Sequence, residues 1–146
     1  MSRYLIVAHQ TATSPELERK VKALLAEDTA AEFAVLVPAA PSSSFSWEGE
    51  SVDVAERRAE AASTLLETAG AKVVRTAVGA QDPLLAIVDE MREHPGYHAI
   101  VVCTLPPGIS RWLSLDLPHR VQRKFHVPVH HVVAEAGTLA APSHPY

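Results

Sequence analysis

Five short apolar runs alternate with helical patterns along the chain, and this alternation limits the fold more than any other feature. The runs cover residues 3–8, 32–37, 72–78, 98–103 and 129–133, and most of them are almost continuously apolar. Such strands are typical of a sheet that is covered on both faces. With 146 residues, 47% hydrophobic and 21% charged, the chain predicts one α/β domain. We expect a Rossmann-like, five-stranded parallel sheet of order 3-2-1-4-5 with helices on both faces.

The segments between the runs carry helix start and stop signals. Two of them begin with a capping residue followed by proline, Ser14-Pro15 and Asp82-Pro83, the arrangement favoured at helix starts. A third helix is predicted to begin at Ser51 and to end at Gly70, and a fourth covers residues 117–125. The expected inward positions are Ala55, Ala59, Ala62, Leu66 and Ala69 in the helix from Ser51, and Leu84, Ile87, Val88 and Met91 in the helix from Pro83.

Two segments fall outside this alternation. Residues 38–50 are rich in proline and serine and longer than most connections, which predicts a mobile or functional segment. Its Phe45 and Trp47 could form a lid or simple anchors. The domain is expected to cover residues 3–133, and residues 134–146 to form a loose tail.

Composition excludes several classes of protein. A single cysteine, Cys103, excludes an internal disulfide and a cysteine-rich zinc site and fits a reducing compartment. A formal net charge of −4 argues against a nucleic-acid partner. No apolar run approaches the ~18 residues of a membrane span, and the first strand leaves no room for a signal peptide. We therefore expect a cytoplasmic protein without membrane or nucleic-acid partners.

Ligands of open parallel sheets bind at the carboxyl ends of the strands, where the strand order reverses. In the predicted order this point lies between the first and fourth strands. Hydroxyls and guanidinium groups there could bind an anion, and no cofactor is predicted beyond an anion or a nucleotide. Arg111 could instead pair with Asp116, and Trp112 could stack on a ligand or fill the pocket. The candidate ligand-binding residues are His9, Gln10, Thr11, Thr104, Gly108, Ser110, Arg111 and Arg120.

Catalysis and metal binding have weaker support in the sequence. His9 could act as a base near neutral pH, but no order of serine or cysteine with histidine marks a triad, so no catalytic residue is assigned. His130 and His131 are adjacent on a strand, so their side chains point to opposite faces and cannot share a metal. No metal site is predicted.

Four segments carry a resemblance to a known family over residues 3–133. They are LIVAHQTATS after the start, VGAQDPLLAIVDE at the helix from Pro83, YHAIVV at the fourth strand and RVQRKFHVPVHHVV near the end. In this order and spacing the chain resembles the universal stress proteins. The resemblance implies an adenine nucleotide alpha hydrolase-like fold, a role in stress response or regulation, and a homodimer paired through the last strand.

The chain departs from the ATP-binding members of that family. Their fourth strand is followed by Gly-x-x-Gly, nine residues and Gly-Ser/Thr, whose backbone approaches the phosphates. Cys103 and Pro106 stand near the first two glycine positions and Leu115-Asp116 near the last pair. Gln10 replaces the aspartate that usually ends the first strand. The resemblance therefore implies a subgroup that lacks the usual ATP-binding glycine motif.

Three hypotheses remain open. The first is a small-molecule or anion-binding module without conventional ATP binding. The second is a nucleotide-binding protein with weak hydrolase activity, using His9 with Ser110 or Asp116. The third is a dimeric scaffold that binds no ligand. The sequence leaves enzymatic activity uncertain and favours a protein that is not an enzyme.

Overall fold

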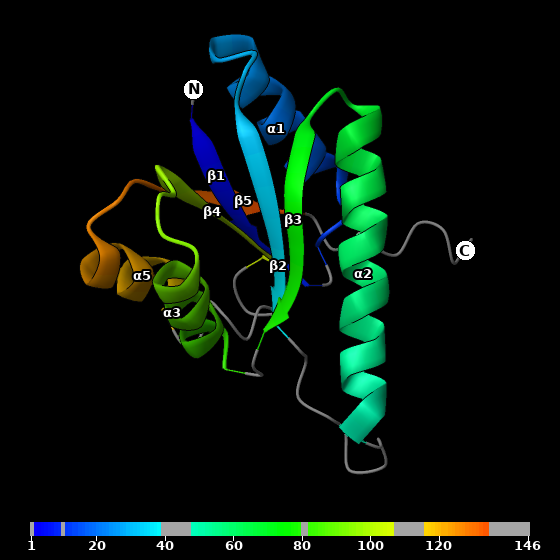
Figure 1. Ribbon diagram of the computed structural model, residues 1–146, viewed down its shortest axis with the longest axis vertical. Helices are drawn as coiled ribbons and strands as arrows, with labels where there is room; N and C mark the ends of the chain where they lie inside the picture. The colour runs from blue at the N-terminus through cyan, green and yellow to red at the C-terminus, as the bar shows by residue number, and fades with distance from the viewer. Residues whose placement is uncertain (1, 10, 39–47, 80–81, 107–115, 135–146) are drawn as a thin grey trace.

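A computed structural model of the chain describes residues 2–9, 11–38, 48–79, 82–106 and 116–134. Strands and helices alternate along these residues, as Figure 1 shows. The elements are β1 (Arg3–Val7), α1 (Pro15–Glu27), β2 (Glu32–Pro38), α2 (Glu48–Thr68), β3 (Lys72–Gly79), α3 (Pro83–Glu93), β4 (Ala99–Thr104), α5 (Leu117–Phe125) and β5 (Val129–Val133).

The sheet has five parallel strands in the order β3-β2-β1-β4-β5. This confirms the predicted fold class and strand order. The central strand β1 pairs with β2 on one side and β4 on the other, with Val7 opposite both Leu36 and Val102. The connection that follows β1 and the connection that follows β4 therefore leave the sheet on opposite faces at the carboxyl end of β1.

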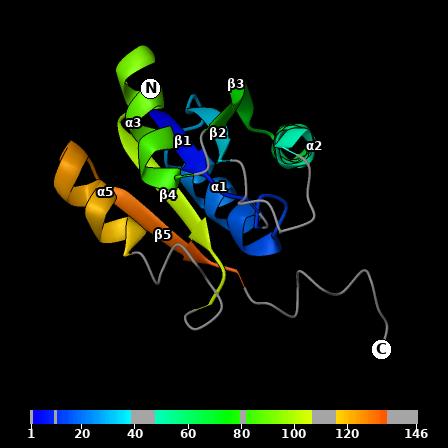
Figure 2. The same cartoon turned by 90° about the horizontal axis from the view of Figure 1, so that it is seen from below.

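Helices cover both faces of the sheet (Figure 2). On one face, α1 and α2 pack on a cluster that includes Phe33 and Leu66, both fully buried. On the other face, α3 and α5 pack on a second cluster that includes Ile87 and Ile100. Among the described helices, none is both long and apolar enough to cross a membrane.

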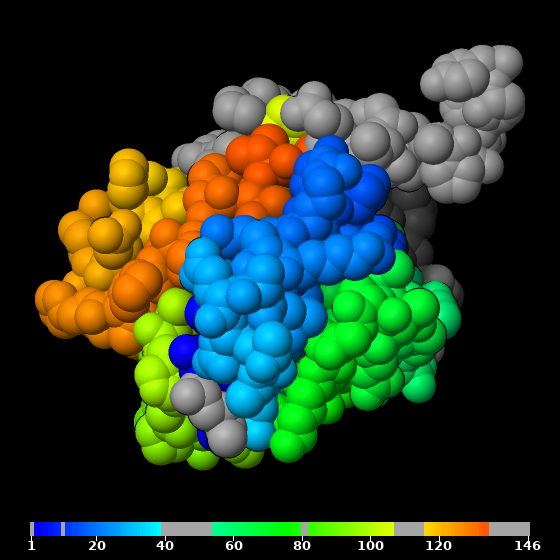
Figure 3. Space-filling view, turned by 90° about the horizontal axis from the view of Figure 1, so that it is seen from above, coloured from blue at the N-terminus to red at the C-terminus, as the bar shows by residue number. Residues whose placement is uncertain are grey.

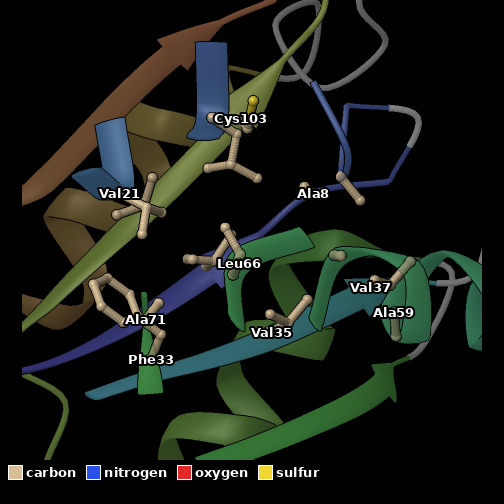
Figure 4. Packing of buried hydrophobic residues seen from close by; sticks show 14 of the residues in the cluster. Ala8, Val21, Phe33, Val35, Val37, Ala59, Leu66, Ala71 and Cys103 are labelled. Atoms are coloured by element: carbon tan, nitrogen blue, oxygen red, sulfur yellow. The ribbon is translucent and has the colours of Figure 1, made fainter. Parts of the chain in front are cut away.

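The inner face of α2 consists largely of alanine. Ala55, Ala59 and Ala62 are at most 4% exposed, and Leu66 completes this alanine face of α2 against β2 (Figure 4). These were the predicted inward positions, although the predicted Ala69 is only partly buried. The predicted start at Ser51 was wrong, because α2 begins at Glu48. Acidic residues are favoured in the first helical turn, which explains the earlier start.

The other helix boundaries follow the predicted caps. The hydroxyl of Ser14 accepts a hydrogen bond from the Leu17 amide at 3.2 Å, and the carboxylate of Asp82 accepts from the Leu84 amide at 3.0 Å. Gly70, the residue predicted to end α2, has φ +100°, a conformation that glycine adopts without strain. Local capping chemistry is therefore enough to position these ends.

The inward face of α3 differs from the prediction. Pro83, Ala86, Ile87 and Glu90 are buried, whereas the predicted Val88 is only partly buried. The reason is an ion pair with the buried carboxylate of Glu90, in which partly exposed Arg75 of β3 donates to both carboxylate oxygens at 2.9 and 3.2 Å. Tyr97 donates a further hydrogen bond to Glu90 at 2.7 Å. These contacts allow a glutamate to occupy a core position.

The predicted tail begins with an ordered contact. Ala134 is fully buried, and its amide donates to the Thr104 carbonyl at 2.8 Å. Residues 135–146 and most of the 38–50 segment, including Phe45 and Trp47, lie outside the described residues.

Candidate functional site

The candidate site lies at the carboxyl ends of β1 and β4, where the strand order reverses. The chain leaves β1 toward α1, on the face that α2 also covers, whereas β4 continues toward α5 on the opposite face. Parallel sheets bind ligands at this kind of divergence. The residues that follow β1 and end β4 therefore decide what the site can hold.

Thr11 fastens the turn after β1 to the end of β4. Its hydroxyl donates to the Cys103 carbonyl at 2.9 Å, and the side chain is 2% exposed. The Ser14 hydroxyl lies 3.8 Å from the Cys103 sulfur. Burial raises the pKa of Cys103 and outweighs hydrogen bonds from Thr11 and Ser14 that lower it, so the sulfur stays a thiol at neutral pH. On this side of the site, the hydroxyls of Thr11 and Ser14 are therefore already in contact with Cys103.

Thr104 is held from the other side by β5. Its hydroxyl lies 2.8 Å from Nε2 of His131, and it too is only 2% exposed. Burial, followed by the charge of His119, lowers the pKa of His131, so this imidazole is neutral at pH 7. Meanwhile, the ring of His130 meets Tyr4 edge-on, with centroids 6.2 Å apart. The contact between Thr104 and His131 therefore links the carboxyl ends of β4 and β5.

His9 has a different environment from the threonines. It follows β1 directly, is partly buried, and its Nε2 is buried without a hydrogen-bond partner among the described residues. Burial, followed by the charge of Arg58 in α2, lowers the pKa of His9 to about 4. At neutral pH the imidazole is uncharged, with one ring nitrogen as donor and the other as acceptor.

Arg58 of α2 is the charged residue that, after burial, lowers the pKa of His9. Its Nε is also buried without a hydrogen-bond partner in the described part of the chain, and burial lowers its pKa. Sequence reasoning missed this residue. The signal that could have found it is helical spacing, because Arg58 falls three residues after Ala55 and four before Ala62, within the inward stripe.

The structure brings together only some of the predicted site residues. His9, Thr11 and Thr104 gather at the ends of β1 and β4, and both threonine hydroxyls already have internal partners. Arg120 lies on α5, which covers the opposite face of the sheet from α2. The remaining candidates, Gln10, Gly108, Ser110 and Arg111, lie outside the described residues, as does Trp112.

The chemistry of the described groups favours binding over catalysis. A neutral imidazole and a guanidinium together offer hydrogen-bond donors to an acceptor-rich group. Asp116, a hypothetical partner of His9 in hydrolysis, instead accepts a hydrogen bond at 3.0 Å from Nδ1 of His119 in the helix that it precedes. The donors of His9 and Arg58 therefore have the chemistry that suits an oxygen-rich group.

The fold is shared with solved universal stress proteins. One from Archaeoglobus fulgidus superposes with a TM-score of 0.62 at 19% identity, covering 90% of this chain and 93% of that chain. The structure of the Archaeoglobus fulgidus protein in complex with dAMP gives 0.59 at 21% identity, covering 90% and 97%. A universal stress protein in complex with cAMP gives 0.57 at 20% identity, covering 90% and 96%. No protein-family model and no curated protein matches the sequence.

Proposed function

We propose that this protein is a small-ligand-binding module of the universal stress type, acting in stress response or regulation. The observation that supports it is the fold, shared over 90% of the chain with proteins solved in complex with dAMP and cAMP. The position of His9 at the strand divergence supports the same conclusion. A buried, free Cys103 favours a reducing, cytoplasmic location.

The proposed ligand is a nucleotide or smaller anion that is not held as ATP is held by a glycine loop. Pro106 lacks an amide donor where such a loop needs one. Asp116 places a carboxylate at the start of α5, in the left-handed conformation with φ 56°. That charge would repel a triphosphate at this helix start. Together these residues favour a ligand that carries less phosphate.

Binding of dAMP to isotope-labelled protein tests the proposal. We expect saturable shifts of the backbone amide signals of Thr11 and Thr104, because a ligand at the carboxyl edge lies beside both. The internal control is a set of amides at the amino-terminal ends of the strands, which should not shift. They belong to Arg3, Glu32 and His98. At ~100 times the dissociation constant, the ligand should add about 2.7 kcal/mol to the unfolding free energy.

Other results would favour the other two hypotheses. If neither dAMP nor cAMP gives a saturable shift at millimolar concentration, the scaffold hypothesis replaces this one. If phosphate is released from a nucleotide above the buffer rate, and His9→Ala abolishes the release, the hydrolase hypothesis replaces it.

We also propose a homodimer that forms through the free edge of β5. This strand contains no acidic residue, lysine or arginine and lies at the surface between α1 and α5 (Figure 3). The other edge strand, β3, carries Lys72 and Arg75 and a register irregularity opposite Phe33 and Ala34, features that protect edges from pairing. β5 is therefore the edge that remains open to a second copy.

A proline at position 131 should abolish the dimer. The Pro128 carbonyl and the Ala134 amide bond to β4, so alternation in a parallel ladder directs the His131 amide outward. His131→Pro removes that donor, whereas His131→Ala keeps it, and both lose the contact with Thr104. In sedimentation at micromolar concentration we expect a monomer for His131→Pro and a dimer for His131→Ala. Identical assembly of the two variants would exclude pairing through β5.

A further inference from the structure

Two side-chain nitrogens of the described residues are buried without any hydrogen-bond partner, and the charge of one of these side chains acts on the other. They are Nε2 of His9 and Nε of Arg58. A buried polar atom without a partner is costly, and native structures contain few of them. Two at one place indicate that a partner is missing there.

The residues next to His9 and Arg58 are buried on the same face of the sheet. Ala8, which precedes His9, and Ala59, which follows Arg58, are buried in the same apolar cluster (Figure 4). The positive charge of Arg58 also acts on the His9 imidazole. Arg58 of α2 and His9, which follows β1, are therefore close enough to interact electrostatically at the carboxyl end of β1.

Arg58 differs from the other arginines that are tied to the sheet. Arg75 is paired with Glu90 and Arg3 with Glu32, whereas no carboxylate pairs with Arg58 in the ranges that the structure describes. Among the described residues, burial is the cause of its lowered pKa and no acidic group offsets the guanidinium charge. A partly buried guanidinium without an anion is an unusual arrangement.

We propose that Arg58 and His9 form an oxyanion subsite that receives the phosphate group of a small phosphate monoester. The guanidinium donates charge-assisted hydrogen bonds from its buried Nε–H, and the imidazole adds a donor from its ring nitrogen. This inference rests on the proposed function and assigns the phosphate group of the ligand to Arg58 and His9. It places the anion beside α2, rather than at the loop after β4.

Occupation of the subsite has a consequence for His9. Arg58 is the charged group that acts on His9 among the described residues, and a bound anion would counter its effect. An opposite charge in contact with an imidazole favours the protonated form. The pKa of His9 should therefore rise from about 4 when phosphate binds, and the protein should take up a proton.

The test compares two arginine variants of the same helix. Arg58→Gln removes the buried donor, and Arg57→Gln alters an exposed neighbour and is the matched control. Inorganic phosphate, dAMP and deoxyadenosine are titrated while the His9 ring signals are followed by NMR. We expect Arg58→Gln to weaken phosphate and dAMP binding by at least about tenfold, and Arg57→Gln by less than about twofold. Deoxyadenosine binding, which lacks the phosphate, should not change.

Each remaining outcome decides between the two proposals. If dAMP binds wild type and Arg58→Gln equally, the subsite is overturned while the proposed function stands. If phosphate shifts the His9 signals and raises its pKa but no nucleoside ligand binds, the subsite stands and the proposed nucleotide function fails. If phosphate leaves His9 unchanged in the wild type, the subsite is overturned. Arg58→Lys, which keeps the charge without the buried Nε–H, replaces Arg58→Gln if that variant does not fold.

Discussion

Glu90→Ala is expected to lower the free energy of unfolding by about 3 kcal/mol, the low end for breaking a buried ion pair. The substitution removes the acceptor of Arg75 at 2.9 Å and of the Tyr97 hydroxyl at 2.7 Å. Tyr97 is 7% exposed, so its hydroxyl would be left buried without a partner. The Arg75 side chain is 36% exposed, which lets water replace part of the lost contact. Chemical denaturation measures the change.

Asp89→Ala is the matched control for this prediction. Asp89 forms an exposed pair with Arg92 on the same helix, at 2.9 Å, and such pairs contribute less than about 0.5 kcal/mol. An equal loss of stability in Asp89→Ala and Glu90→Ala would show that the buried pair has no special role.

The same carboxylate should make stability depend on pH. Burial raises the pKa of Glu90, but hydrogen bonds from Arg75 and Tyr97 outweigh it, so the folded value lies below the ordinary 4.5. The contribution is therefore complete above pH 4.5 and is lost as the pH falls through the lowered folded value. The stability difference between wild type and Glu90→Gln should shrink in that range, and a constant difference would contradict the assignment.

Gly79→Ala should destabilise the protein by about 1–3 kcal/mol through overpacking. A Cβ at Gly79 would lie 2.5 Å from the Cβ of Ala86 and 3.2 Å from Cδ1 of Leu36. The first contact is with a methyl group that cannot rotate away, so β3 or α3 must move. Thermal unfolding of the variant measures the cost.

A second substitution tests whether that contact is the cause. Ala86→Gly removes the obstructing methyl group and by itself should cost about 1 kcal/mol in helix propensity. If the clash is responsible, the double variant Gly79→Ala/Ala86→Gly should be more stable than the sum of the two single changes predicts. If the changes in unfolding free energy are strictly additive, glycine is required at position 79 for its backbone conformation and not for the missing side chain.

The sequence was sufficient to predict the fold, because local chemistry and tertiary packing agree at most elements. Ser14 and Asp82 cap the helices that they were expected to cap, and α5 and β5 have the expected bounds. The prediction was wrong where a tertiary partner decides the outcome. Periodicity selected Val88 for the inward face of α3, whereas Glu90 is buried because Arg75 and Tyr97 lie opposite.

The candidate site was harder to predict for a similar reason. The position of the candidate site follows from strand order, and His9, Thr11 and Thr104 were predicted to lie there in this way. Whether a hydroxyl is free for a ligand depends on partners distant in sequence, such as Cys103 for Thr11. Arg58 was missed because a charged residue in a helix is usually solvent-facing, so its position within the inward stripe of α2 was not used, and the structure shows its Nε to be buried.

Because the inner face of α2 consists largely of alanine, this part of the core tolerates smaller side chains better than larger ones. Ala55, Ala59 and Ala62 leave almost no side-chain volume to lose, and each substitute larger than serine must push a 21-residue helix away from β2. Neutral drift at these positions is therefore confined to glycine and serine, while the exposed face of α2 can change freely. Diverging descendants of this chain would retain the spacing of small residues long after overall identity had faded.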